Sequence, residues 1–195
     1  MNDRQLTSDV ELLIDRLGPL PEPAAKPVII VVSGLPYSGK SYFCRQLAGR
    51  LPLPIIESDA MRQTLSPTPD YSKGENDRLF RACHNLIDSL LRRGVSAIFD
   101  ATNLMERHRE QLYRIAGRTG ARLIVVRVEA PPEVIRQRLA MRQEGLDPND
   151  KSEADWETYE RMRANAQRIN RNHFAVDTSR DIGPAIDKIV REVNR

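Results

Sequence analysis

Five short runs of apolar, mostly β-branched residues, each separated from the next by a segment of helical period, constrain this chain of 195 residues more than any other feature. Continuous apolar runs of this length are typical of strands covered on both faces, and strands that alternate with helices form a parallel sheet wrapped by helices. We therefore predict an α/β fold in which helices cover both faces of a five-stranded parallel sheet. The predicted strands are 28–33, 54–58, 95–100, 122–128 and 173–178.

The N-terminal segment differs from the rest of the chain. Ser8 and Glu11 have the spacing of a capping box, apolar residues follow on one face, and Gly18-Pro19 ends the pattern. This combination predicts a short appended helix. Residues 18–27 are rich in proline and predict an extended linker. We therefore divide the chain into an N-terminal helix with its linker, residues 1–27, and one domain, residues 28–195.

The composition limits the expected cellular location of the protein and the metal sites it can form. No stretch approaches the roughly 18 apolar residues that are needed to span a bilayer. We therefore expect a cytoplasmic protein that needs neither a membrane nor an obligate protein partner. Cys44 and Cys83 lack CxxC spacing and fall on apolar helix faces, which predicts two buried free thiols. The three histidines are too scattered for a local zinc site, so any metal should arrive with a nucleotide.

A complete GxxxxGKS motif, GLPYSGKS over residues 34–41, follows the first predicted strand and precedes an amphipathic segment. In that setting backbone N–H groups and a helix N-terminus face the phosphates of a nucleoside triphosphate. Lys40 is expected to reach the β- and γ-phosphates, and Ser41 to bind Mg²⁺. We therefore predict ATP and Mg²⁺ as ligands of a three-layer P-loop NTPase fold with strand order 2-3-1-4-5. The predicted nucleotide-binding residues are Gly34, Pro36, Tyr37, Ser38, Gly39, Lys40, Ser41 and Tyr42.

Motifs that are missing narrow the class of P-loop protein. No N/TKxD-type strand end, which GTPases use to bind guanine, follows the fourth or fifth strand, and no LSGGQ-like signature of ABC ATPases occurs. The third strand ends in IFDATN, without the Asp-Glu pair whose glutamate polarises water in ATP-driven motors. Hydrolysis as the main reaction is therefore disfavoured. A kinase, which needs an acceptor pocket and cations near the γ-phosphate, is favoured.

Two strand ends supply candidates for the acceptor site, because ligands of parallel sheets bind at the carboxyl edge. Asp59 and Arg62 lie about one helical turn apart after the second strand. Asp59 is expected to accept the proton of the attacking hydroxyl, although Ser58 or Asp59 also suits a helix N-cap. Asp100 ends the third strand, where its carboxylate can hold Mg²⁺ through water or orient Arg62. Thr102 and Asn103 follow, and they either cap the next helix while facing the acceptor or only cap it.

A helix that opens at Pro131-Pro132 carries the predicted lid, about residues 138–160. Arg138 and Arg142 are four residues apart and share one face, so their guanidinium groups repel unless an anion lies near them. A transferring phosphoryl group is such an anion, and the polar stretch over residues 143–155 predicts a mobile segment. A solvated basic face is the alternative. The stripe that begins with Trp156 and Tyr159 predicts a helix that packs on the sheet.

Taken in order, these segments are similar to the polynucleotide-kinase-like branch of P-loop kinases, which includes zeta-type toxins, chloramphenicol phosphotransferase and gluconate kinase. The resemblance lies in GLPYSGKS, SDAMR, FDATNLMERHR and RQRLAMR and covers roughly residues 28 to 180. It implies that Asp59 is the general base and that Arg62 contacts a phosphate of the acceptor. It also implies that Arg138 or Arg142 stabilises the transferring group, and it matches Asp100 to the third-strand aspartate.

The predicted function is therefore ATP-dependent transfer of the γ-phosphate to a hydroxyl. The acceptor stays open among a small molecule, a nucleoside and the 5′-hydroxyl of a polynucleotide. The acidic stretch over residues 147–157 does not favour a polyanionic acceptor. Two alternatives remain, an ATP-binding regulatory module with slow ATPase activity and a zeta-toxin-like sugar-nucleotide kinase.

Overall fold

A computed structural model describes residues 3–143 and 155–195 of the chain. Within them, five strands form one parallel sheet in the order β2-β3-β1-β4-β5, which confirms the predicted fold class and strand order. Each strand lies within two residues of its predicted bounds. The strands are β1 (Val28–Ser33), β2 (Ile55–Glu57), β3 (Ala97–Asp100), β4 (Arg122–Glu129) and β5 (Phe174–Asp177).

The central strand β1 explains why its sequence is apolar without interruption. All six of its residues are buried, and it pairs with β3 on one side and β4 on the other. Ile29 and Val31 belong to the core on one face of the sheet, whereas Ile30 and Val32 belong to the core on the other. Both faces of the strand are therefore apolar because both are covered.

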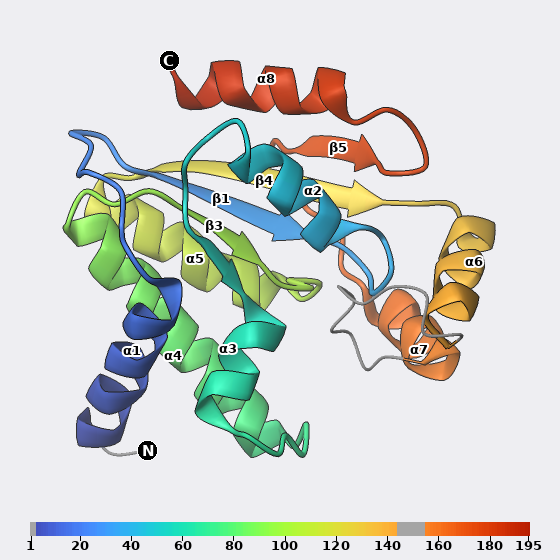
Figure 1. Ribbon diagram of the computed structural model, residues 1–195, viewed down its shortest axis with the longest axis horizontal. Coiled ribbons are helices and arrows are strands. Elements are labelled where there is room, and N and C mark those ends of the chain that lie inside the picture. Colours follow the sequence, from blue (N-terminus) through green and yellow to red (C-terminus); the bar gives the residue numbers. More distant parts are fainter. Residues whose placement is uncertain (1–2, 144–154) are drawn as a thin grey trace.

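Helices cover both faces of the sheet, and Figure 1 shows the two layers. One core contains residues of α1, α3, α4 and α5, and the other contains residues of α2 and α8. Cys44 and Cys83 lie one in each core as buried free thiols, as predicted. The helices are α1 (Asp3–Leu17), α2 (Lys40–Ala48), α3 (Ser58–Leu65), α4 (Lys73–Arg92), α5 (Glu106–Thr119), α6 (Pro132–Gln143), α7 (Trp156–Asn165) and α8 (Gly183–Val193).

The N-terminal helix α1 is longer than predicted and packs closely on the domain. It already contains residue 3, so Ser8 is an interior residue and the predicted capping box is wrong. Gly18, with a φ of 71°, follows its last residue, as the sequence indicated. Asp9 is fully buried and forms an ion pair with Arg78 of α4 at 2.6 Å, while Leu13 lies in the core. No helix of the described residues is long and apolar enough to cross a membrane.

Helices α6 and α7 lie side by side beyond the carboxyl end of β4 (Figure 1). Tyr159 of α7 packs in a small apolar cluster with Ile135 and Leu139 of α6 and with Tyr37 of the P-loop. Trp156 and Tyr159 therefore pack against α6 and not on the sheet, which corrects the prediction for the start of the stripe. Ile169, at its end, packs with Val125 of β4. The central part of the predicted lid, residues 144–154, lies outside the described residues.

Candidate active site

The P-loop connects β1 to α2 at the carboxyl edge of the sheet. The N–H of Gly34 donates to the Thr102 carbonyl at 3.1 Å, and a Cβ added to Gly34 would lie 2.4 Å from the Val128 carbonyl oxygen. Gly39 has a φ of 87°, and a Cβ there would lie 2.8 Å from Oγ1 of Thr178. Both glycines are therefore required by the close approach of neighbouring chain segments, and at Gly39 by the left-handed backbone as well.

The first two residues of α2 carry the charged and hydroxyl groups of the motif. Nζ of Lys40 donates to the Leu35 carbonyl at 3.0 Å, so the ammonium group lies across the P-loop. Oγ of Ser41 donates to Oδ2 of the buried Asp100 at 2.7 Å. The two residues predicted to bind Mg²⁺ are thus in direct contact at the ends of neighbouring elements.

This oxygen pair suits a hard cation that takes its remaining ligands from phosphate and water. No group of three or more His, Cys, Asp or Glu side chains within the described residues could hold a metal by itself. Oγ of Ser38 is buried and has no hydrogen-bond partner among these residues. A buried donor of this kind in a P-loop fits a phosphate oxygen, so the residues present are compatible with a metal-bound nucleotide.

Tyr37 joins the P-loop to α6. Its φ of 60° is unusual for a residue with a side chain, and its ring is buried against α6 and α7. The Tyr37 carbonyl accepts a hydrogen bond from Nη1 of Arg138 at 2.9 Å, and its hydroxyl accepts one from Nη1 of Arg142 at 2.6 Å. The two arginines therefore share one face of α6, as predicted, and that face is turned toward the P-loop.

Arg138 and Thr178 hold the other side of the loop. Nη1 of Arg138 donates to Oγ1 of Thr178 and Nη2 to the Thr178 carbonyl, both at 3.0 Å. Thr178 Oγ1 in turn donates to the Ser38 carbonyl at 2.6 Å. Burial lowers the pKa of the Arg138 guanidinium. Arg138 thus anchors the P-loop to the end of β5, a contact that the sequence did not predict.

Asp59 lies at the same edge of the sheet as Asp100. Glu57 pairs with Asp100 across β2 and β3, and Asp59 follows two residues later in the first turn of α3. The N-cap residue of α3 is Glu57, without a side-chain capping bond. The alternative that Ser58 or Asp59 caps this helix is therefore wrong, because both residues are already helical.

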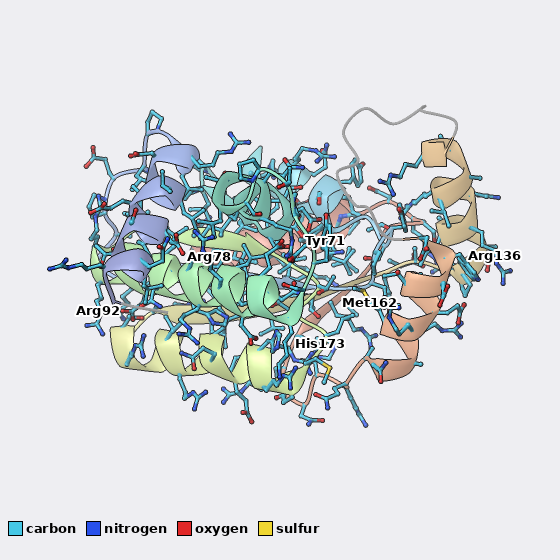
Figure 2. The ribbon with its side chains drawn as sticks, turned by 90° about the horizontal axis from the view of Figure 1, so that it is seen from below. Tyr71, Arg78, Arg92, Arg136, Met162 and His173 are labelled. Atoms are coloured by element: carbon cyan, nitrogen blue, oxygen red, sulfur yellow. The ribbon has the colours of Figure 1, made fainter. Side chains whose placement is uncertain are left out.

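Arg62 is placed differently from the prediction that it contacts the acceptor. Its side chain is 8% exposed and forms an ion pair with Glu75, while Nη2 donates to Oδ1 of Asn76 at 2.6 Å. The guanidinium lies 4.7 Å from the ring centroid of Tyr71. Tyr71, labelled in Figure 2, belongs to the loop before α4. Both terminal nitrogens are thus bound to α4, and Arg62 fastens α3 to the first turn of that helix.

Thr102 and Asn103 follow β3 and have different surroundings. Asn103 is 1% exposed, and its Nδ2 donates to the Val32 carbonyl at 2.9 Å, so its side chain lies in the interior and does not face an acceptor. Thr102 is half-buried and lines a cleft described below. Neither residue caps α5, whose N-cap residue is Met105, so the capping alternative is wrong for both.

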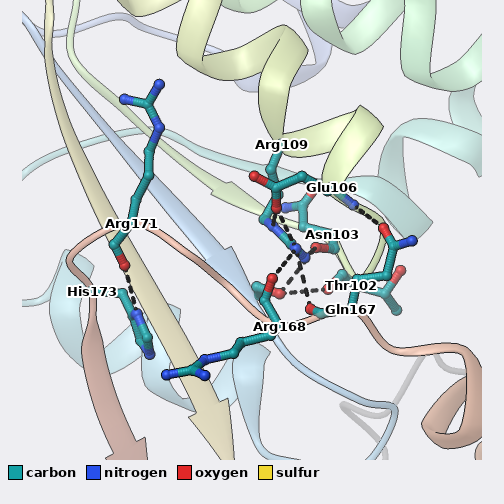
Figure 3. A network of polar contacts seen from close by, with 9 residues as sticks. Thr102, Asn103, Glu106, Arg109, Gln167, Arg168, Arg171 and His173 are labelled. Atoms are coloured by element: carbon teal, nitrogen blue, oxygen red, sulfur yellow. Dashed lines mark hydrogen bonds and ion pairs between the residues drawn. The ribbon is translucent and has the colours of Figure 1, made fainter.

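The fully buried Arg109, which the sequence did not mark as a site residue, holds the turn after β3 (Figure 3). Its guanidinium donates to the Asn103 carbonyl at 2.6 Å and to the carbonyls of Gln167 and Arg168 at 3.1 and 3.0 Å. It also forms an ion pair with Glu106 on the preceding turn of α5. Arg109 therefore ties the β3–α5 turn to the segment before β5. The only local signal was the Glu-Arg pair three residues apart.

Comparison with known proteins agrees with this architecture. The AAA domain family matches residues 29–169, more than half of the chain, and the protein therefore belongs to this family. A comparison with curated proteins found no matching sequence. The polynucleotide-kinase-like branch is not specifically supported by the matches.

Several solved structures share the fold, and three of them are compared with this chain. Kti12 from Chaetomium thermophilum, in complex with ADP-AlF3, has a TM-score of 0.70 at 21% identity, with 85% of this chain and 96% of that chain covered. The APS kinase of Mycobacterium tuberculosis, with AMPPNP and APS, has a TM-score of 0.61 at 16% identity, with 90% and 100% covered. A gluconokinase from Sinorhizobium meliloti 1021 has a TM-score of 0.58 at 22% identity, with 86% and 89% covered. At these identities the likeness establishes the P-loop fold.

Proposed function

We propose that this protein is an ATP-dependent kinase that transfers the γ-phosphate to a hydroxyl group of an acceptor. The observation that carries the proposal is the contact between Ser41 and Asp100 at the carboxyl edge of the sheet. Asp59 lies at the same edge because Glu57 pairs with Asp100 in the sheet. The residues that we assign to the nucleotide, the metal and the acceptor hydroxyl thus follow the carboxyl ends of β1, β3 and β2.

Each group has a defined part in this reaction. The backbone N–H groups of residues 34–41 and the Lys40 ammonium hold the phosphates of ATP. Ser41 and Asp100 would hold Mg²⁺, which neutralises phosphate charge when bound. The acceptor oxygen forms a bond to the γ-phosphorus while the bond from that phosphorus to the β–γ bridging oxygen breaks. The hydroxyl proton passes to the Asp59 carboxylate, and ADP leaves.

The solved structures named above support this reaction class, because two of the three are kinases. The finer resemblance to polynucleotide kinases makes a 5′-hydroxyl one acceptor to test among others. Arg142 and Arg138, which lie on α6 beside the P-loop, are the proposed cations near the transferring group.

Substitution of Asp59 tests the proposed chemistry. Asp59→Asn removes the proton acceptor but keeps the size of the side chain, so phosphoryl transfer should fall by about a hundredfold to ten thousandfold. The affinity for ATP with Mg²⁺ should stay within about twofold, because Asp59 is proposed to contact the acceptor and not the nucleotide. Labelled γ-phosphate transfer and calorimetry measure the two quantities.

Asp15→Asn, at an exposed position of α1, is the matched control and should behave like the unmodified protein. Equal losses of transfer and ATP affinity in Asp59→Asn would reduce Asp59 to a structural residue. The transfer assay should cover oligonucleotides, nucleosides, sugars and antibiotics. Tight ATP binding with slow hydrolysis and no transfer to any of them would favour the regulatory module instead.

A further inference from the structure

A cleft of about 1040 Å³ opens between α4, α5 and α7, next to the proposed reaction edge. Thr102, two residues after Asp100, lies on one wall. Asn76, which accepts a hydrogen bond from Arg62 of α3, lies on another. Met162 of α7 lies across from the first turns of α4 and α5 (Figure 2). Asp59 and Asp100 do not themselves line the cleft, which begins at the turn after β3 and at the α4 partner of Arg62.

The walls of this cleft are basic. Four of the described lining residues are lysine or arginine, and Asp77 is the only carboxylate among them. Lys73, Arg81 and Arg107 form no ion pair within the described residues. The cleft thus has a clear excess of positive charge, and the side chains of the described residues do not neutralise it.

Three arginines of the same two helices that lie outside the cleft have acidic partners, whereas Arg114 of α5 donates to the amide oxygen of Gln111 at 2.8 Å. Arg78 of α4 binds the buried Asp9, and Arg92 of α4 and Arg118 of α5 both bind Asp88 at 2.9 Å. Arg78, Arg92 and Arg118 thus have acidic partners outside the cleft, whereas Arg81 and Arg107 of the cleft have none within the described residues. This contrast indicates that the charges of the cleft are placed for an anion.

The inner wall of the cleft is aromatic and uncharged. The rings of Phe80 and His108 meet edge to face with centroids 5.0 Å apart, and the ring of His84 lies 6.3 Å from that of Phe80. Nε2 of His84 is buried without a hydrogen-bond partner among the described residues. Burial lowers the pKa of His84 to about 4 and also lowers the pKa of His108, so both rings are neutral at pH 7. A flat, polar but uncharged group suits such a wall.

We propose that this cleft binds the phosphoryl acceptor, and that the acceptor is a small molecule with a phosphate group, a flat ring and a free hydroxyl. This inference rests on the kinase function proposed above. The phosphate would lie against Arg81 and Arg107, the ring against Phe80 and the histidines, and the hydroxyl near Asp59. The volume lies at the upper end of the range of small-molecule sites, so it accommodates one nucleotide-sized molecule. A neutral sugar would leave the cations without a counter-charge.

Matched pairs of probes test this inference. Cytidine and cytidine 3′-monophosphate both have a free 5′-hydroxyl and differ only in the phosphate, and an oligonucleotide of about ten residues with a free 5′-hydroxyl is the long probe. Calorimetry in the presence of a non-hydrolysable ATP analogue measures binding without turnover. The monophosphate should bind at least about tenfold more tightly than cytidine, as expected for one or more charge-assisted hydrogen bonds.

The double variant Arg81→Ala and Arg107→Ala should reduce that preference to less than about twofold and leave the affinity for the ATP analogue unchanged. Arg114→Ala, at an exposed position of α5 that does not line the cleft, is the matched control and should keep the preference. Equal binding of cytidine and its monophosphate would overturn the inference, and so would an equal loss in Arg114→Ala. Tighter binding of the oligonucleotide than of the monophosphate would show that the occupant is a nucleic acid and not a small molecule.

The outcomes also separate this inference from the proposed function. If the monophosphate binds with the expected dependence on Arg81 and Arg107 but no phosphate is transferred to any acceptor, the cleft assignment stands and the kinase proposal fails. If neutral acceptors are phosphorylated and the double variant transfers to them at the full rate, the kinase proposal stands and the cleft assignment fails.

Discussion

The nucleotide side and the acceptor side of the candidate site are built in different ways. Around the P-loop, Arg138 and Thr178 bind loop carbonyls, and Ser41 binds Asp100. In the acceptor cleft, by contrast, Arg81 and Arg107 have no ion pair within the described residues. The protein itself therefore holds the P-loop in place, whereas the cations that we assign to acceptor binding have no acidic partner among the described residues. The triphosphate is the same in every nucleotide substrate, so fixed backbone N–H groups can bind it. The acceptor differs from one kinase to another, so we expect side chains to bind it.

Removal of the Lys40 ammonium group should give the largest loss of activity. It should impair the use of ATP and leave binding in the acceptor cleft unchanged. Lys40→Ala should lower phosphoryl transfer by about a thousandfold or more, because a charged group aimed at the transferring phosphate is lost. Stability should change little, since Nζ contributes a single hydrogen bond, to the Leu35 carbonyl, among the described residues. Transfer assays and thermal unfolding measure this, with the exposed Lys188→Ala as control. Full turnover in Lys40→Ala would contradict the assignment of the P-loop.

The partly buried His84 of the cleft should make stability depend on pH. The pKa of His84 is lowered to about 4 in the folded protein, so between pH 6.5 and 4 the unfolded chain binds a proton that the folded protein does not. Stability should therefore fall as the pH falls through this range, by roughly 3 kcal/mol from this group. Urea unfolding at several pH values should show a shallower loss for His84→Leu, with His173→Gln as control. Parallel curves for His84→Leu and the unmodified protein would contradict the burial of this ring.

The substitution Gly39→Ala tests whether the P-loop can change its conformation. Gly39→Ala forces a side chain into a left-handed backbone and places its Cβ 2.8 Å from Oγ1 of Thr178. Together these effects should cost about 2 kcal/mol of folding stability, and a loop that shifts to relieve them should bind ATP more weakly, while binding in the acceptor cleft is unchanged. Gly117→Ala is the control, because a Cβ there meets no atom within 4 Å and lies inside α5. Unchanged ATP affinity in Gly39→Ala would show that the loop is more adaptable than its contacts indicate.

The same contrast explains what could be predicted from the sequence. The strand bounds, the strand order and the P-loop follow from local signals, namely β-branched runs and one motif of eight residues. The contact between Ser41 and Asp100 follows from the motif together with the order of the strands. The apolar pattern thus specifies the sheet, and the sheet places the ends of its strands at one edge.

Side chains whose partners come from distant segments could not be predicted. Arg62 and Asn103 were expected to face the acceptor, but Glu75 binds the first and the Val32 carbonyl the second. Arg109 binds carbonyls almost 60 residues away, so no local pattern marks it as buried. The acceptor cleft itself is made by three helices without a common motif. The hydrogen-bond partners of these polar side chains depend on the tertiary structure. The periodicity and spacing of residues in the sequence therefore cannot predict them.

Removal of the hydrogen bond between Tyr37 of the P-loop and Arg142 of α6 should give the smallest loss of activity. Tyr37→Phe removes the hydroxyl that accepts a hydrogen bond from Arg142 at 2.6 Å but keeps the ring in its apolar cluster and the carbonyl that binds Arg138. Because Arg142 is partly exposed, water can replace the lost bond, and kcat should fall by only about fivefold, close to 1 kcal/mol, with the affinity for ATP unchanged.

A double-mutant cycle sharpens this last expectation. If the hydroxyl acts by positioning Arg142, Tyr37→Phe should reduce kcat no further in a protein that already carries Arg142→Ala. Gln46→Ala, at an exposed position of α2 outside the P-loop, should have no effect in either background. Additive losses would show that the two groups act separately, and the nucleotide side would then be fixed by Arg138 and Thr178 without help from the second arginine of α6.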